Sequence, residues 1–122
     1  MPGNGRVIVS CTHGEEAPDR VLVSYLTAGA ALDQGKEVVM WLTSDGVRLA
    51  TRGYTDGIRV DKDPPGQRLH AQFIEKGGRF YVCPVCVKTR GMEDAVWTKG
   101  AEVKGAPSVY EFTEGGALTF SY

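Results

Sequence analysis

The chain has 122 residues, with 14 basic and 15 acidic side chains and a formal net charge of -1 at pH 7. This length suits one domain over residues 1–122, and the near-neutral charge excludes a broad electrostatic attraction to nucleic acid or to an anionic membrane. The first residues do not combine a basic leader with a long apolar run. We therefore expect neither a signal peptide nor a transmembrane helix, and we expect a cytoplasmic protein.

The first third of the chain alternates between strand and helix patterns. Residues 5–11 form a continuous, β-branched apolar run, which is typical of a parallel strand covered on both faces. Pro18 suits the first turn of a helix, and apolar residues recur at helical spacing from there until Gly35. Residues 36–43 then form a second apolar run, which predicts a second strand.

The middle of the chain predicts three further helices and a third strand. Residues 44–53 suggest a short helix that ends at a glycine, and residues 54–66 are a loop by their Gly, Asp and Pro content. Residues 67–78 place their apolar side chains on one side of a helix. A third strand is expected at residues 79–83, followed by a helix that begins at Pro84.

The last third of the chain consists of short patterns. Residues 101–105 and 117–122 favour strands, while residues 107–116, with a proline in front and glycines behind, favour a short helix. Strands and helices alternate without a repeat or a linker. The sequence therefore predicts an α/β domain with a mostly parallel, five-stranded sheet flanked by helices.

Several chemically capable side chains follow the first three predicted strands. In an open parallel sheet the carboxyl ends of the strands meet at one edge, where ligands and reactions collect. The residues expected at this edge are Cys11, His13, Ser44, Asp45, Cys83 and Cys86.

Cys86 is the first candidate for a reactive group. It falls in the first turn of the helix expected from Pro84, where unpaired N–H groups and the helix dipole stabilise a thiolate. Lys88 and Arg90 follow closely and would add positive charge. Free cysteines are also often buried, and burial is the simpler interpretation of Cys11.

The stretch "GGRFYVCPVCVKTRGM", residues 77–92, resembles the DsrE/DsrF-like family, which includes sulfur-relay subunits of the TusBCD type. The resemblance covers most of the chain, up to a short final strand at "LTFSY", and the cysteine turn is its most specific part. It implies a three-layer α/β domain and a homo-oligomer, trimeric or hexameric, that exchanges sulfur with donor and acceptor proteins and needs no cofactor. In that family one cysteine after the third strand carries sulfane sulfur as a persulfide, and the pattern "CVKTRGM" matches it to Cys86.

Cys83 departs from the family pattern and leaves three chemical hypotheses open. In the first, Cys86 accepts a sulfur atom and passes it on as a carrier or sulfurtransferase, while Cys83 shelters or releases the outer sulfur. In the second, Cys83 and Cys86 form a dithiol redox pair, in which Cys83 attacks and Cys86 resolves. In the third, the two cysteines bind structural zinc together with Cys11 and His13, because tetrahedral zinc needs four ligands.

Overall fold

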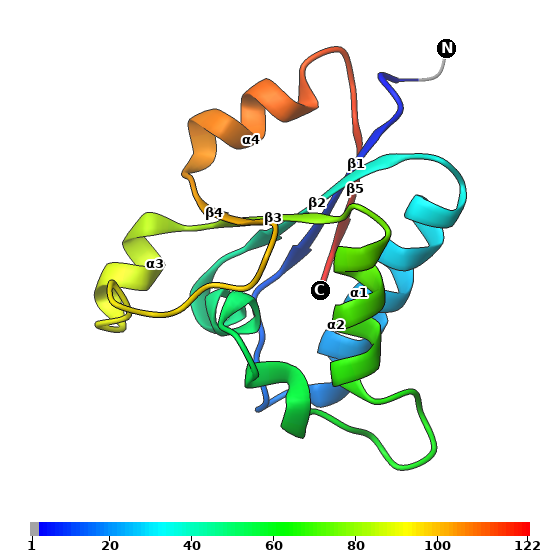
Figure 1. Cartoon of the computed structure of the whole chain (residues 1–122). Coiled ribbons are helices and arrows are strands. Elements are labelled where there is room, and N and C mark those ends of the chain that lie inside the picture. The colour runs from blue at the N-terminus through cyan, green and yellow to red at the C-terminus, as the bar shows by residue number, and fades with distance from the viewer. Residues whose placement is uncertain (1–2) are drawn as a thin grey trace.

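A five-stranded sheet with helices on both faces forms the centre of the computed structural model, which describes residues 3–122 (Figure 1). The strands are β1 (Arg6–Cys11), β2 (Glu37–Leu42), β3 (Arg79–Val82), β4 (Ala101–Val103) and β5 (Leu118–Ser121). The order across the sheet is β4-β3-β2-β1-β5, and every neighbouring pair is parallel. The expected α/β fold class is therefore confirmed, with a sheet that is parallel throughout.

The connections between the strands are helical. They are the α-helices α1 (Pro18–Asp33), α2 (Gly66–Glu75), α3 (Pro84–Thr89) and α4 (Ala106–Thr113), and the 3-10 helices η1 (Ser44–Ala50) and η2 (Tyr54–Gly57). Helices α1, α3 and α4 each have a proline in their first two positions, where the fixed φ angle suits a helix and the missing N–H has no partner to lose. Gly35 and Gly91 follow the ends of α1 and α3 with φ angles of +79° and +62°, which glycine adopts without strain.

The two faces of the sheet are covered unequally. Val7, Val9 and Cys11 of β1 pack in a large core with α1, α2 and η1, whereas Ile8 belongs to a small cluster that includes Phe112 of α4. Figure 1 shows α4 on one side of the sheet and α1 and α2 on the other. The strand at residues 5–11 is thus covered on both faces, as its uninterrupted apolar run predicts.

The segment after β2 differs from the expectation. Instead of one helix over residues 44–53 and a loop, it forms the two short 3-10 helices η1 and η2. Gly53 separates them with a left-handed φ angle of +84°, a conformation that no α-helix can contain. The element after β2 ends at Ala50 rather than at Gly53, so it is shorter and more tightly wound than predicted.

Candidate functional site

The carboxyl ends of the three central strands lie side by side, as expected for a parallel sheet. The register aligns Cys11 with Leu42 and Leu42 with Val82. The backbone continues this alignment past the strands, because Thr43 N–H donates to the Cys11 carbonyl at 3.3 Å and Cys83 N–H donates to the Leu42 carbonyl at 3.0 Å. The segments that follow β2 and β3 therefore start from adjacent positions.

The segment after β2 is packed tightly against the end of β1. Gly46 is buried, and a Cβ atom at this position would collide with the carbonyl oxygen of Cys11. Its N–H donates to the Thr43 carbonyl at 2.9 Å, which closes a turn around Ser44 and Asp45. Ser44 lies within this turn at a φ angle of +51°, a left-handed conformation that is uncommon outside glycine.

The turn directs a backbone N–H at the candidate sulfur. Ser44 N–H donates to Cys86 Sγ at 3.1 Å. Cys86 is the third residue of α3, so it lies in the first helical turn as predicted, and its side chain is partly exposed. A hydrogen-bond donor at this distance favours negative charge on the sulfur.

Arg90 connects the two segments at the other end of α3. Its Nε donates to Asp45 Oδ1 at 2.9 Å, and its Nη1 donates to the carbonyl oxygen of Cys86 at 3.3 Å. The Arg90 hydrogen bond lowers the pKa of Asp45, so this carboxylate is ionised at neutral pH. Lys88, the other cation expected here, is exposed and takes part in none of these contacts.

The expectation that the first helical turn leaves Cys86 with a depressed pKa is wrong. Partial burial raises the pKa of the Cys86 thiol most, and contact with the Cys83 thiol raises it further. The Ser44 N–H and the Arg90 charge lower the pKa of Cys86, but these two effects are smaller in sum. In the unliganded protein the thiol form of Cys86 is thus favoured more strongly than in a free cysteine.

Cys83 precedes α3 as its N-cap residue, and its side chain is partly buried. Both Cys83 and Cys86 are free thiols. They are close enough for the Cys83 thiol to affect the ionisation of Cys86, so the two sulfurs form one site.

Cys11 and His13 do not join this site. Cys11 is fully buried in the core, where it contacts the His13 carbonyl at 3.5 Å, and desolvation raises the pKa of its thiol. The His13 ring contacts Glu16 at 2.8 Å. Residues 3–122 contain no group of three or more metal-binding side chains. The four-ligand zinc hypothesis with Cys11, His13, Cys83 and Cys86 is therefore wrong, because the chain turns Cys11 into the core.

The sequence pattern missed the part that Ser44 and Asp45 have in this site. Both were expected at the shared sheet edge, but neither was assigned a role there. Ser44 acts through its backbone N–H, which every residue except proline has, so its residue type gives no signal. Asp45 acts through Arg90. A usable signal was the position of both residues directly after β2, next to the strand that leads to Cys83.

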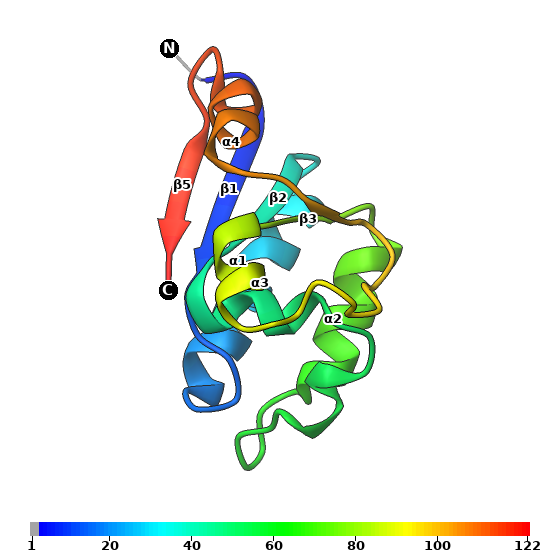
Figure 2. The ribbon, with the colours of Figure 1, turned by 90° about the vertical axis from the view of Figure 1, so that its left-hand side faces the viewer.

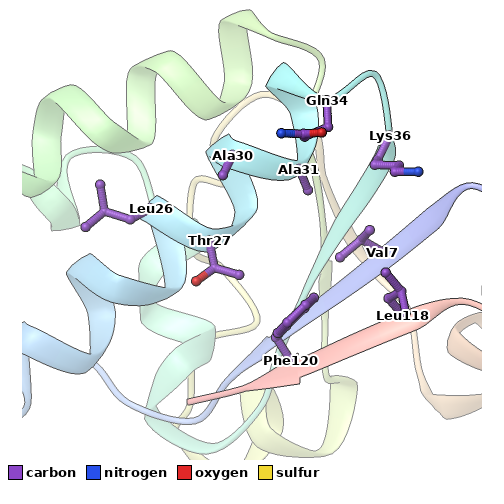
Figure 3. Close-up of a pocket in the computed structure, with 9 residues that line it drawn as sticks. All are labelled: Val7, Leu26, Thr27, Ala30, Ala31, Gln34, Lys36, Leu118 and Phe120. Carbon is purple, nitrogen blue, oxygen red and sulfur yellow. The ribbon is translucent and has the colours of Figure 1, made fainter.

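An apolar groove lies elsewhere on the surface, between α1 and the strands β1 and β5 (Figure 3). Its volume is about 460 Å³, and the cysteine site is not part of its lining. The lining residues are Val7, Leu26, Thr27, Ala30, Ala31, Gln34, Lys36, Leu118 and Phe120. Among residues 3–122, no helix has the length and apolar character that crossing a membrane requires.

Comparisons with known proteins agree with the fold. The chain is 33% identical over 97 residues to an uncharacterised protein of Methanopyrus kandleri, which covers 80% of this chain and 74% of that protein. It is 26% identical over 101 residues to an uncharacterised protein of Methanocaldococcus jannaschii, which covers 83% of this chain but only 37% of the relative's length.

Among solved structures, the YchN protein of E. coli matches with a TM-score of 0.76 at 18% identity, over 96% of this chain and 97% of that one. At this identity the likeness establishes the fold. Residues 5–120 match the DsrE/DsrF-like family, which is nearly the whole chain. The chain therefore belongs to the DsrE/DsrF-like family.

Proposed function

We propose that this protein is a sulfur carrier or sulfurtransferase that holds sulfane sulfur as a persulfide on Cys86 and passes it to a partner protein. The observation that carries this proposal is the partly exposed thiol of Cys86 with a backbone N–H directed at its sulfur. Membership of a family with sulfur-relay members supports it. No cofactor takes part, because thiol exchange needs only the two sulfur centres.

The chemistry consists of two exchange steps. In loading, the Cys86 thiolate attacks the outer sulfur of a donor persulfide, the donor's S–S bond breaks, and the donor leaves as a thiolate. In unloading, an acceptor thiolate attacks the outer sulfur on Cys86, and Cys86 Sγ leaves as the thiolate. Each step forms one S–S bond and breaks one, so no external oxidant or reductant is required.

Cys83 gives the site a second possible outcome. Its thiol could attack Cys86 Sγ of the persulfide, which would form a Cys83–Cys86 disulfide and release the outer sulfur as hydrosulfide. This route supports the dithiol redox pair as an alternative function, and the contact between the two thiols favours it. Both functions need reduced cysteines between cycles, which supports the expected cytoplasmic location.

The test is the intact mass of the reduced protein after exposure to a low-molecular-weight persulfide, with Cys83→Ser and Cys86→Ser treated in parallel. We expect wild type and Cys83→Ser to gain one sulfur atom, and Cys86→Ser to gain none. The Cys11→Ser variant is the control, since its buried thiol should not compete.

Retention of sulfur by Cys86→Ser would overturn the assignment to Cys86. Loss of two hydrogens by wild type, without retained sulfur, would favour the dithiol pair instead. The two readings thus predict different masses for the same sample.

We also propose that the chain forms a homo-oligomer, trimeric or hexameric, and meets sulfur donor and acceptor proteins through the surface around Cys86. The apolar groove beside β5 supports self-association, because Leu118 and Phe120 leave 61% and 42% of their surface exposed there. Exposed apolar side chains that cluster along an edge strand are typical of interaction surfaces.

A further inference from the structure

We propose that Asp45 and Arg90 are positioning residues that hold the Ser44 N–H against Cys86 Sγ, and that this N–H stabilises the sulfur as it leaves during unloading. The second half of this inference rests on the proposed sulfur-carrier function. The first half concerns the geometry of the free thiol and can be tested without any sulfur transfer.

Arg90 joins η1 to α3 through its hydrogen bonds, and we call Arg90 and Asp45 together the clamp. One edge of the guanidinium donates to Asp45 Oδ1 at 2.9 Å, and another N–H donates to the backbone carbonyl of Cys86 at 3.3 Å. These contacts tie the start of η1 to α3, although the two segments are 45 residues apart in sequence. Arg90 is well suited to this part because its planar fork of donors bridges two acceptors, which a lysine ammonium does less well.

Asp45 links the Arg90 contacts to the N–H group that donates to Cys86 Sγ. It is the covalent neighbour of Ser44, whose N–H reaches Cys86 Sγ at 3.1 Å. Ser44 is held at a φ angle of +51°, a conformation that costs energy for a residue with a side chain. A turn under such strain relaxes unless neighbouring contacts hold it. The Asp45–Arg90 ion pair at 2.9 Å is the shorter side-chain contact at this point, and Arg48, on η1 itself, lies 3.7 Å from the same Asp45 oxygen.

The charged and titratable groups at and next to the Cys86 site come from α3, from its two flanks and from η1, which also carries Arg48, 3.7 Å from Asp45. Cys83 precedes α3, Arg90 follows it, and Asp45 belongs to η1. Lys88 is on α3 itself but exposed. Removing the Asp45 charge by itself should favour the thiolate, because one negative charge near the sulfur disappears.

A positioning role for Asp45 predicts that the pKa of Cys86 changes in the opposite direction. If Asp45 works by holding the turn, then Asp45→Asn weakens the link to Arg90, the Ser44 N–H moves away, and the thiolate loses its donor. The pKa of Cys86 then rises in spite of the lost negative charge. The direction of the change therefore separates a positioning residue from a merely nearby charge.

The same geometry indicates which sulfur atom of a persulfide on Cys86 the Ser44 N–H would stabilise. In a persulfide on Cys86, Sγ is the inner sulfur, and unloading breaks its bond to the outer sulfur. The electron pair of that bond stays on Sγ, where the Ser44 N–H is directed. A stabilised leaving thiolate speeds transfer to the acceptor, because thiol exchange is faster with a better leaving group.

The experiment measures the pKa of Cys86 from the pH dependence of its alkylation rate by iodoacetamide, in a Cys83→Ala background that leaves one accessible thiol. Asp45→Asn and Arg90→Lys are compared with this parent, and Lys88→Gln is the control that removes a cation without touching the clamp. We expect the pKa of Cys86 to rise by about one unit in both clamp variants. The thiolate fraction at neutral pH would then be about tenfold smaller. Lys88→Gln should leave it unchanged.

A lower or unchanged pKa in Asp45→Asn would overturn the inference, since simple charge removal predicts that result. If Asp45→Asn does not fold, Arg90→Lys tests the same inference. This variant keeps the positive charge but removes the planar guanidinium, so an unchanged pKa of Cys86 in it would contradict the clamp.

The proposed role of the Ser44 N–H in sulfur release is tested separately. The same variants are loaded with persulfide, and the rate of sulfur release to a small thiol is measured. About threefold slower release from the clamp variants is expected, and equal rates would contradict the leaving-group role. If the parent accepts no sulfur at all, the proposed function fails while the alkylation result still decides the clamp.

Discussion

At the scale of single residues, burial controls the ionisation of His70 as it does that of Cys86. The His70 ring is 9% exposed and stacks on Phe80, with ring centroids 5.4 Å apart. Its Nδ1 lies 2.6 Å from the Tyr25 hydroxyl, and its Nε2 lies 3.2 Å from the Thr98 hydroxyl. A neutral imidazole satisfies both contacts, because the Tyr25 and Thr98 hydroxyls can each donate or accept a hydrogen bond. Desolvation accordingly lowers the pKa of His70 to about 4.

This pKa predicts a loss of stability in mild acid. The unfolded chain protonates His70 near its ordinary pKa of about 6.5, whereas the folded protein resists protonation until about pH 4. Between these values the unfolded state binds the additional proton, so the free energy of unfolding falls as pH falls. The loss attributable to His70 reaches roughly 3 kcal/mol near pH 4 and does not grow below it.

The measurement is urea unfolding from pH 8 to pH 4 for wild type and His70→Gln. The glutamine keeps a neutral hydrogen-bonding side chain but does not titrate. We expect the variant to have a shallower pH dependence between pH 6.5 and 4, and equal slopes for the two proteins would contradict the assignment to His70.

At the scale of elements, the site depends on how closely η1 packs on the end of β1. Gly46 provides this closeness, since its missing side chain leaves room for the Cys11 carbonyl. The turn around Ser44 follows from that packing, together with the hydrogen bond from Gly46 N–H to Thr43. A buried backbone contact in the core therefore sets the position of an N–H at the surface.

Gly46→Ala should both destabilise the protein and disturb the site. The added methyl group forces η1 away from β1, which costs about 1–3 kcal/mol of unfolding free energy and moves Ser44 away from Cys86. Gly57→Ala is the matched control, because no atom lies within 4 Å of a Cβ there. Thermal unfolding and the alkylation rate of Cys86 would be measured for both, and equal behaviour of the two variants would contradict the packing argument.

At the scale of the whole molecule, the sheet has an unprotected edge. Strand β5 pairs with β1 on one side only and forms one border of the sheet (Figure 2). All four of its residues are exposed, and none of them is charged or a proline. Natural proteins usually protect such an edge with charge, with proline or with a covering partner.

We therefore expect a particle larger than one chain of 13.2 kDa in solution. Light scattering during gel filtration should give three or six times this mass, in line with the family resemblance. Phe120→Lys should lower the mass by placing a charge in the groove of Figure 3, while Tyr110→Lys, on α4 and outside that groove, should not. A monomeric wild type, or a Phe120→Lys variant of unchanged mass, would contradict this use of the groove.

Much of the fold could be predicted from the sequence because its signals are local. Pro18 and Pro84 start helices, Gly35 and Gly91 follow their ends, and the run at residues 5–11 is apolar on both faces of its strand. Alternation of strands and helices leads to a parallel sheet, and a parallel sheet brings its strand ends to one edge. The placement of Cys86 in a first helical turn followed from the same rules.

The sequence by itself thus determined most of the elements, their parallel arrangement and the identity of the candidate cysteine, but not the two 3-10 helices after β2. It also favoured the burial of Cys11, which the structure confirms. Only the tertiary structure decided that Arg90 rather than Lys88 reaches the site and that the pKa of Cys86 is raised. The physical reason is the range of the forces involved. Helix starts and stops depend on residues a few positions apart, whereas desolvation and the hydrogen bond between Ser44 and Cys86, 42 residues apart, exist only once the chain has packed.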